Sequence, residues 1–443
     1  MTFQDLNLNT PLLNALDDMG HEQPTAIQSE VFPVAMSGKD LFGIAQTGTG
    51  KTIAYLLPCL RKWTFTKEKS PQFLILVPTR ELVIQVVEVA KALAAYTSIR
   101  VSGIYGGVNM IRQMDVVTEG CDVLVATPGR LLDFIFKGSI RMKSIKVLVI
   151  DEVDEMLNLG FRHQLVNILD LLPPKRQNLL FSATLTEDIE VLALQYFNQP
   201  VNLTTSAGPL AQIRQQGYDV PNFNTKINLL EHLLRLHPEM RKVLVFATTK
   251  KMADQIYDQM VLRLDDPVGV MHSNKAQQNR FNTVQHFQDG DIRVLIATDI
   301  VARGIDVSFV SHVINFELPE LPEQYIHRIG RTGRADQHGV AICFITEAEK
   351  EKQQAIEDLM QMSIPMSPLP DDLEISAVLT RDEMPVINMK SVKVKLPKAG
   401  ESGGAFHEKK DKNKKVNNPI RKKDKMKLKY KKPKTRGQKK KGD

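Results

Sequence analysis

The stretch "AQTGTGKT", residues 45–52, constrains this chain more than any other feature of its sequence. The apolar run in "KDLFGI" before it favours a buried strand, and "TIAYLLPCL" after it is apolar at helical spacing. Small residues between a strand and a helix let backbone N–H groups point at phosphates, and a helix start favours negative charge. The pattern predicts a phosphate-binding loop in which Lys51 reaches the terminal phosphates and Thr52 holds Mg²⁺. The alternative, a glycine turn with an exposed lysine, is disfavoured by the strand and helix on either side.

Short apolar runs alternate with helical patterns along most of the chain. "FLILVP", "DVLVATP", "KVLVIDE" and "NLLFSAT" come first, and the alternation restarts with "KVLVFATT", "VGVMH", "RVLIATD" and "HVINFEL". This order predicts an α/β protein with two domains, each a parallel sheet covered by helices. Ligands of such sheets bind at the carboxyl ends of the strands, where most polar clusters fall here. The expected divisions are a segment 1–29, a first domain 30–205, a linker 206–216, a second domain 217–365, an extension 366–398 and a tail 399–443.

The positive charge of the chain is concentrated at its carboxyl end. Residues 401–443 contain 18 Lys and Arg against 5 Asp and Glu, so the remaining residues carry a slight acidic excess although the whole chain is +7. A block of this kind buries little apolar surface, and we expect a disordered basic tail that attracts polyanions. A lysine-rich segment that only keeps the protein in solution is an equally good interpretation of the tail alone.

The rest of the composition is that of a soluble globular protein, with 42% hydrophobic and 25% charged residues. Cys59, Cys121 and Cys343 lie far apart and show no metal-binding or redox spacing, which favours a reducing compartment. The first residues do not resemble a signal peptide, and no apolar run approaches membrane-spanning length. We therefore expect no membrane association and a cytoplasmic protein, or a nuclear or nucleolar one if the source is eukaryotic.

A second cluster, "VLVIDEVDEM", places two carboxylates directly after an apolar run. Asp151 is positioned to hold Mg²⁺, in part through water, and Glu152 to orient and deprotonate the water that attacks the γ-phosphate. Acidic residues after a strand often only cap a helix. Because a phosphate-binding loop lies about 100 residues upstream, the catalytic interpretation is favoured over capping alone.

Eleven motifs in a fixed order make the resemblance specific. They are "GHEQPTAIQ", "AQTGTGKT", "PTREL", "GG", "TPGR", "DEVD", "SAT", "VLVFATT", "QQNR", "ATDIVARGID" and "HRIGRTGR". Over about 360 residues the sequence resembles a DEAD-box RNA helicase of superfamily 2, and among bacterial members with basic tails the RhlE-like group is the most similar. The resemblance implies two RecA-like domains and RNA-dependent hydrolysis of ATP with Mg²⁺ as cofactor.

For the nucleotide site, the resemblance implies that Gln28 reads the edge of adenine. An amide satisfies a donor and an acceptor together, which gives a preference for ATP over GTP. The residues implied in ATP binding are Phe3, Gln23, Thr25, Gln28, Ala45, Gln46, Thr47, Gly48, Thr49, Gly50, Lys51, Thr52, Gly304 and Asp306. Those implied in catalysis are Lys51, Asp151, Glu152 and two arginine fingers, Arg331 and Arg334, whose planar guanidinium groups suit charge on the γ-phosphoryl oxygens.

The resemblance also assigns coupling and RNA-binding roles. Ser182 and Thr184 are expected to bond Asp154 and, with His327, to couple hydrolysis to RNA. The implied RNA contacts are Pro78, Thr79, Arg80, Gly106, Gly107, Thr127, Pro128, Gly129, Arg130, Arg280, Thr298 and Asp299. Taken singly, "TPGR" is an ordinary turn, "SAT" a cap and an arginine pair three residues apart a solvated pair. The ordered series favours function for all of these, and less so for His327, which could be an ordinary surface histidine.

Two positions depart from the family pattern. Val153 stands where alanine is usual, and because this side chain should pack behind the strand it costs space rather than chemistry. His21 replaces the usual aromatic residue after Gly20 and offers adenine a smaller surface, which puts nucleotide affinity in doubt.

The expected partners are single-stranded RNA and short duplex RNA, with ribosomal precursors or RNA-degradation complexes as candidates; nothing indicates an oligomer. Three other functions remain open. They are a DNA helicase of the same superfamily, an ATP-dependent RNA clamp without catalysis, and an RNA-annealing protein that acts through its tail. The "PTAIQ" segment argues against the first, and Glu152 with both arginines against the second.

Overall fold

The computed structural model describes residues 1–46, 48–204, 213–299, 310–333 and 339–384. Within this part of the chain the strands form two seven-stranded sheets in which every pair is parallel. The prediction of two parallel α/β domains is therefore confirmed. Of the described helices, none is long and apolar enough to cross a membrane.

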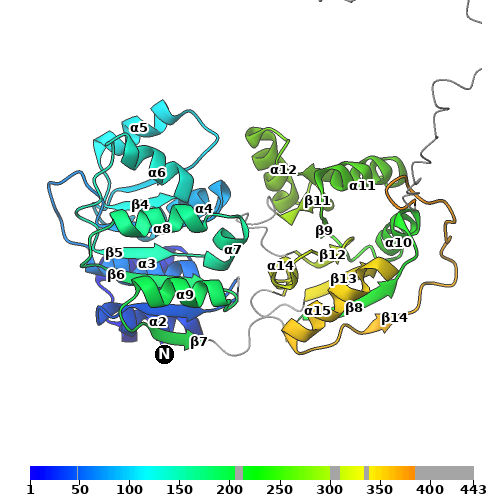
Figure 1. The fold of residues 1–443 in the computed structure, drawn as a ribbon, viewed down its shortest axis with the longest axis horizontal. Coiled ribbons are helices and arrows are strands. Elements are labelled where there is room, and N and C mark those ends of the chain that lie inside the picture. The colour runs from blue at the N-terminus through cyan, green and yellow to red at the C-terminus, as the bar shows by residue number, and fades with distance from the viewer. Residues whose placement is uncertain (47, 205–212, 300–309, 334–338, 385–443) are drawn as a thin grey trace, which may run out of the picture. The chain divides into compact units, whose positions relative to one another are not determined.

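The first sheet has the strand order β3-β4-β2-β5-β6-β1-β7 (Figure 1). Its strands are β1 (Leu41–Ile44), β2 (Phe73–Leu76), β3 (Val101–Ile104), β4 (Val123–Ala126), β5 (Val147–Ile150), β6 (Gln177–Ser182) and β7 (Val201–Thr204). The helices of this domain are η1 (Phe3–Leu6), α1 (Thr10–Asp18), α2 (Ala26–Met36), α3 (Lys51–Lys62), α4 (Arg80–Leu93), α5 (Met110–Glu119), α6 (Pro128–Phe136), α7 (Val153–Asn158), α8 (Arg162–Leu171) and α9 (Glu187–Tyr196).

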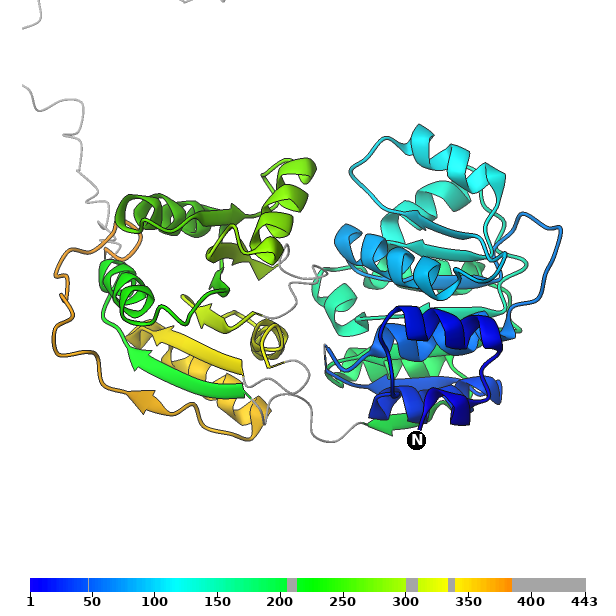
Figure 2. The same cartoon turned by 180° about the vertical axis from the view of Figure 1, so that it is seen from behind.

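Helices cover both faces of this sheet, which is why its central strands are apolar throughout. One core contains residues of α1 to α4 and lies on the face seen in Figure 2. A second core, on the face seen in Figure 1, contains residues of α6, α8 and α9. β2, β4 and β5 are buried along their whole length, as expected for parallel strands between two helix layers.

The second sheet has the order β10-β11-β9-β12-β13-β8-β14. Its strands are β8 (Ile213–Asp219), β9 (Val243–Ala247), β10 (Val268–Met271), β11 (Val294–Thr298), β12 (His312–Asn315), β13 (Gly339–Ile345) and β14 (Met366–Ser367). The described helices around it are α10 (Phe223–Leu236), α11 (Lys250–Arg263), α12 (Gln277–Asp289), α14 (Pro322–Ile329), η3 (Glu347–Glu349) and α15 (Lys350–Met360).

The boundaries of the second domain differ from those expected. Ile213–Gln216, assigned to the linker from sequence, belong to β8 and pair with β13, so the second sheet begins before residue 217. The reason is that "IRQQGYD" is polar at four of its seven positions and contains no apolar run, so its strand character comes from pairing with β13 on one side and β14 on the other. The rest of the predicted linker, 206–212, lies outside the described residues, as does the predicted basic tail, 399–443.

The residues that follow β14 form an extended segment, 368–384, that we call the strap. Three asparagine side chains, two in α10 and Asn222 at its N-cap, donate hydrogen bonds to its backbone carbonyls: Asn228 to Glu374 at 2.8 Å, Asn222 to Ser376 at 2.6 Å and Asn224 to Val378 at 2.8 Å. The strap side chains Ile375 and Val378 are exposed. Its path along the helix is fixed by these main-chain contacts and by two side chains, Leu373 in the apolar core and Glu383, which accepts from the Phe223 N–H at 2.5 Å.

Candidate functional site: a nucleotide pocket at the carboxyl edge of the first sheet

The glycine loop follows β1 and ends in α3, as its sequence predicts. Gly48 and Gly50 have φ angles of 85° and 90°, a region that side chains with a Cβ rarely adopt. Gly50 is the residue before α3, so the first N–H groups of this helix face the loop. The ammonium of Lys51 is buried and has no hydrogen-bond partner among the residues that the structure describes. An unpaired buried cation beside free N–H groups is what a phosphate ligand would satisfy.

This loop lines a cavity of about 260 Å³. From the loop and its helix come Gly48, Gly50, Lys51 and Thr52, and from the end of β5 come Asp151 and Glu152. The cavity is also lined by Arg331, which follows α14 and is 5% exposed. Carboxylates, a lysine and an arginine thus converge on one space, as phosphoryl transfer requires.

Gln28 connects α2 to the glycine loop. Its amide nitrogen donates to the Gly50 carbonyl at 3.2 Å, and its amide oxygen accepts from the Thr25 N–H at 3.0 Å. The Thr25 hydroxyl donates to the Thr49 carbonyl at 2.9 Å. These two side chains, expected to serve the adenine pocket, therefore also hold the loop in place.

The other residues expected near adenine are distributed unevenly. His21 and Met19 line the cavity, and Met19 had not been predicted there. Gln23 is exposed. Phe3 is 5% exposed and belongs to the core beneath α1 and α2, so its contribution to the pocket is through packing.

Asp151 lies at the centre of the charged cluster. It is 3% exposed, and burial raises the pKa of its carboxyl to about 6, an effect that the nearby Lys51 charge opposes and the Glu152 charge reinforces. Tyr55, one turn into α3, is fully buried; burial and the charge of Asp151 raise the pKa of its hydroxyl well above the usual range. The Tyr55 ring packs against Phe181 at a centroid distance of 5.5 Å.

Glu152 has a left-handed backbone, with φ 52° and ψ 49°, and precedes α7. Residues with a Cβ occupy this region at a cost of about 1–3 kcal/mol, and such residues cluster at active sites. The Glu152 N–H donates to the Asp151 carboxylate at 2.9 Å. Both carboxylates line the cavity, which fits one as a metal ligand and the other as a base.

Asp154 forms hydrogen bonds with the "SAT" motif. Its Oδ2 accepts from the N–H groups of Ala183 and Thr184, both at 3.1 Å, and from the Thr184 hydroxyl at 3.0 Å. His327 Nε2 lies 3.5 Å from the same oxygen, and its Nδ1 lies 3.8 Å from Glu155. The four residues assigned to coupling, Asp154, Ser182, Thr184 and His327, therefore meet, with the Ser182 hydroxyl accepting from the Thr184 N–H at 3.3 Å.

Burial and charge act in opposite directions on this cluster. Burial raises the pKa of Asp154, but the nearby His327 outweighs burial and holds the pKa well below its usual range. Burial lowers the pKa of His327, but the carboxylates of Asp154 and Glu155, at 3.5 and 3.8 Å, outweigh it and raise the pKa to about 9. His327 is therefore a charged, buried group and not an ordinary surface histidine.

The residues expected to contact RNA from the first domain lie at the same edge of the sheet, after β2, β3 and β4. The Thr79 hydroxyl caps α4 by accepting from the Leu82 N–H at 3.3 Å. Gly107, with φ 79°, lies against the Arg80 guanidinium so closely that a Cβ would overlap it. Arg130, at the start of α6, donates to the Val108 carbonyl at 3.1 Å. Backbone N–H groups and cations are thus gathered along three adjacent strand ends, with Pro78, Gly106, Thr127, Pro128 and Gly129 between them.

In the second domain, two expected RNA ligands already have protein partners. Arg280 forms an ion pair with Glu81 of "PTREL". The two carboxylate oxygens of Asp299 accept hydrogen bonds from Nε and Nη2 of Arg328, at 2.5 and 2.7 Å. Thr298 is buried at the end of β11. Thr47, Gly304, Asp306 and Arg334 lie outside the described residues.

Arg328 and Tyr55 were not anticipated from sequence. Arg328 is 1% exposed, stacks over Phe246 at 5.0 Å and donates to Asn315 at 3.1 Å besides holding Asp299. It stands inside "HRIGRTGR", so the motif itself was the available signal. No sequence signal pointed to Tyr55, because it is one more apolar position in the pattern that predicts α3.

Two parallel sheets with a glycine loop, strand-end carboxylates and converging arginine define a nucleoside triphosphatase built from two RecA-like domains. The profile described as DEAD/DEAH box helicase matches residues 25–192, and the helicase conserved C-terminal domain matches residues 225–336. The chain belongs to the DEAD-box helicase family.

Curated relatives and solved structures agree with this assignment. The DEAD-box ATP-dependent RNA helicase CshA of Geobacillus kaustophilus is 40% identical over 350 residues, covering 79% of this chain and 74% of its own length. CshA of Bacillus subtilis is 40% identical over 361 residues, covering 81% and 72%. S. cerevisiae Dbp5 bound to RNA and ADP BeF3 is 31% identical with a TM-score of 0.76, over 84% of this chain and 96% of that one. Mss116 bound to ssRNA and UDP-BeF is 26% identical with a TM-score of 0.77, over 84% and 80%. None of these relatives carries the RhlE name, so the RhlE-like subgroup stays a prediction.

Proposed function

We infer that this protein is an ATP-dependent RNA helicase that separates short RNA duplexes locally or remodels RNA–protein complexes, coupled to RNA-stimulated hydrolysis of ATP. The observation that carries the inference is the cavity in which Lys51, the two carboxylates after β5 and Arg331 meet. The curated relatives named above are ATP-dependent RNA helicases, and the solved relatives were bound to RNA and nucleotide analogues.

The residues that face the cavity fit ATP with Mg²⁺. Within the described part of the chain the buried Lys51 ammonium makes no hydrogen bond, and the Asp151 carboxylate with the Thr52 hydroxyl offers the hard oxygen ligands that Mg²⁺ prefers. When bound, Mg²⁺ neutralises charge on the phosphates. Asp151 and Thr52 would hold it, Lys51 would bind the terminal phosphates, and Glu152 would take the proton of the attacking water.

In this mechanism the rate of ATP turnover depends on RNA. The strand-end groups around Arg80, Gly107 and Arg130 suit the phosphates and sugars of a single strand, which carry no base sequence. A strand bent against α6 cannot stay in A-form pairing, so a short duplex opens locally. Hydrolysis then ends the bound state and releases the strand.

The test is ATP turnover and duplex separation by the full-length protein. Turnover should be slow alone and rise strongly with single-stranded RNA, and a short RNA duplex should separate only with ATP. Stimulation by duplex DNA in preference to RNA would favour the DNA translocase instead. Strand annealing without turnover would favour the annealing protein.

Three further assignments complete the proposal. We propose a cytoplasmic protein, or a nuclear or nucleolar one in a eukaryote, on the basis of the three unpaired cysteines and the basic tail. We also propose ribosomal precursors or RNA-degradation complexes as its targets, without an oligomer. Crosslinking in cells followed by sequencing of the bound RNA separates these targets.

A further inference from the structure

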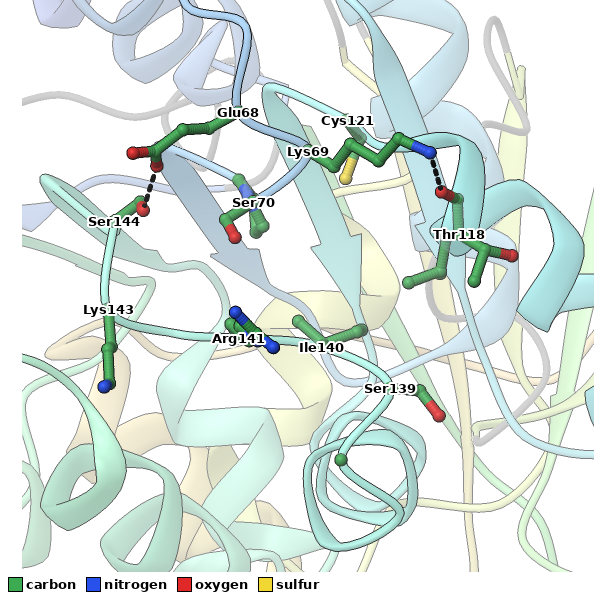
Figure 3. A pocket seen from close by; sticks show the side chains of 13 residues that line it. Glu68, Lys69, Ser70, Thr118, Cys121, Ser139, Ile140, Arg141, Lys143 and Ser144 are labelled. Carbon is green, nitrogen blue, oxygen red and sulfur yellow. Dashed lines mark hydrogen bonds between the residues drawn. The ribbon is translucent and has the colours of Figure 1, made fainter.

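A second and larger cavity, of about 710 Å³, lies in the first domain away from the nucleotide site. Figure 3 shows it from close by, with Arg141 between Lys143 and Ile140 and with the hydrogen-bonded Lys69 and Thr118 at the upper right. None of the sequence motifs discussed above contributes to its lining. Its size lies within the range of about 300–1,000 Å³ typical of small-molecule sites.

The cavity opens at the amino edge of the sheet. Ser70 and Pro71 come just before β2, Cys121 just before β4 and Ser144 just before β5. In a parallel sheet the amino ends of these strands lie at the edge opposite to their carboxyl ends, where the nucleotide and RNA motifs are. A molecule bound here therefore cannot take part in ATP chemistry or continue the expected RNA track.

Charge in the cavity is predominantly positive. The single carboxylate, Glu68, accepts from the Ser144 hydroxyl at 2.8 Å. The Lys69 ammonium donates at 3.2 Å to the Thr118 carbonyl in the last turn of α5, where a cation compensates the helix dipole. Arg141 and Lys143 have no such explanation, because within the described residues neither forms an ion pair or a side-chain hydrogen bond. These two cations are therefore available to bind an anion.

Part of the cavity wall is apolar. Val117, Cys121 and Ile140 are 8%, 1% and 6% exposed, and Pro71 lies beside them. These side chains form a surface on which a flat, uncharged ring system can lie. The hydroxyls of Ser70 and Ser139 provide hydrogen-bonding groups between this surface and the cations.

We propose that this cavity binds a phosphorylated small molecule of nucleotide size, with its phosphate on Arg141 and Lys143 and its ring on the apolar surface around Ile140. A guanidinium binds phosphate through two parallel hydrogen bonds, and a lysine adds a mobile point charge. A concave apolar site with a few charged groups suits one small ligand better than a continuous RNA backbone, which a shallow basic surface binds. Such a ligand would act as an effector, because the reacting groups are at the opposite edge.

The test measures binding of guanosine monophosphate to the full-length protein by calorimetry, with ADP at saturation so that the ATP site is filled. The double variant Arg141→Gln/Lys143→Gln should weaken binding at least about tenfold for each charge-assisted contact removed. The matched control is Arg112→Gln/Lys67→Gln, which removes one arginine and one lysine that are exposed outside the cavity. The control should bind like the unaltered protein. RNA-stimulated ATP turnover should be equal in all three proteins, which confirms that they fold.

Several results of this experiment would contradict the proposed binding site. Equal binding by the double variant and the unaltered protein, or no saturable binding by either, overturns the site. Equal affinity for inorganic phosphate and guanosine monophosphate overturns the role of the apolar surface, and equal affinity for guanosine overturns that of the cations. If neither protein binds guanosine monophosphate and the double variant loses RNA affinity, the two cations bind RNA and the proposal is wrong.

Discussion

Replacing Gln28 with alanine removes one hydrogen bond to the glycine loop and one to Thr25, the N-cap of α2, whose hydroxyl in turn bonds the loop at Thr49. The bonds are those to the Gly50 carbonyl at 3.2 Å and from the Thr25 N–H at 3.0 Å. Because Gln28 is 3% exposed, the groups it leaves behind are largely screened from water. At about 0.5–1.5 kcal/mol for each bond, the loop loses about 1–3 kcal/mol of support.

This loss should appear as weaker binding of anything held by the loop. If all of it is expressed in binding, affinity falls between about fivefold and 150-fold. Dissociation constants measured by calorimetry for ADP and for pyrophosphate separate two roles of Gln28. Adenine reading affects only ADP, whereas support of the loop affects both ligands. We expect both to weaken, ADP more than pyrophosphate.

The control is Gln4→Ala, an exposed glutamine whose side chain has no hydrogen bond within the described residues. It should change neither constant. Unchanged pyrophosphate affinity in Gln28→Ala, together with weaker ADP binding, would refute the argument and leave Gln28 as a reader of adenine alone.

Three further predictions concern the base, the buried histidine and the tail. Glu152→Gln keeps size and hydrogen bonding but removes the base, so ATP-dependent RNA binding should persist while turnover nearly stops; normal turnover would exclude Glu152 as the base. The pKa of His327 is raised from 6.5 to about 9, so the stability it contributes is full below pH 6.5 and is lost as pH rises through 9. The melting temperature should fall over this pH window, because roughly 3 kcal/mol of stability is lost, and this fall should be absent in His327→Asn. Parallel curves of melting temperature against pH for the two proteins would contradict the ion pair between His327 and Asp154. Truncation after Lys398 should weaken RNA binding at low salt and flatten its salt dependence by about 0.7 in log–log slope for each phosphate released, with turnover at saturating RNA unchanged; parallel salt series would show that the tail does not bind RNA.

The elements around the nucleotide were predictable because their causes are local. A short apolar run, a glycine-rich turn and a helical pattern follow one another within residues 39–62, so propensity and spacing determine strand, loop and helix together. Asp151 and Glu152 were found for the same reason, since they directly follow a strand that is buried on both faces. The left-handed backbone of Glu152 was not predicted, because side chains with a Cβ seldom adopt it.

Features that depend on distant pairs were missed. Arg328 reaches Asp299, 29 residues away in the chain, and no local pattern specifies that an arginine will be buried by such partners. The assignment of Asp299 to RNA treated it as free, whereas the structure engages both of its oxygens. The dual role of Gln28 was missed similarly, because its contact to Gly50 spans 22 residues and depends on how α2 packs against α3. The start of β8 was misplaced because its neighbours in the sheet come from residues after 338.

The strap that follows β14 has a consequence for how its sequence can change. Asn222, Asn224 and Asn228 hold it by its carbonyl oxygens, and every residue type supplies a carbonyl. Substitutions at exposed strap positions such as Ile375 and Val378 should therefore accumulate with little penalty, whereas replacement of any one of the three asparagines withdraws a contact that no strap residue can restore. Among related sequences, we therefore expect the three asparagines to vary less than these exposed strap positions.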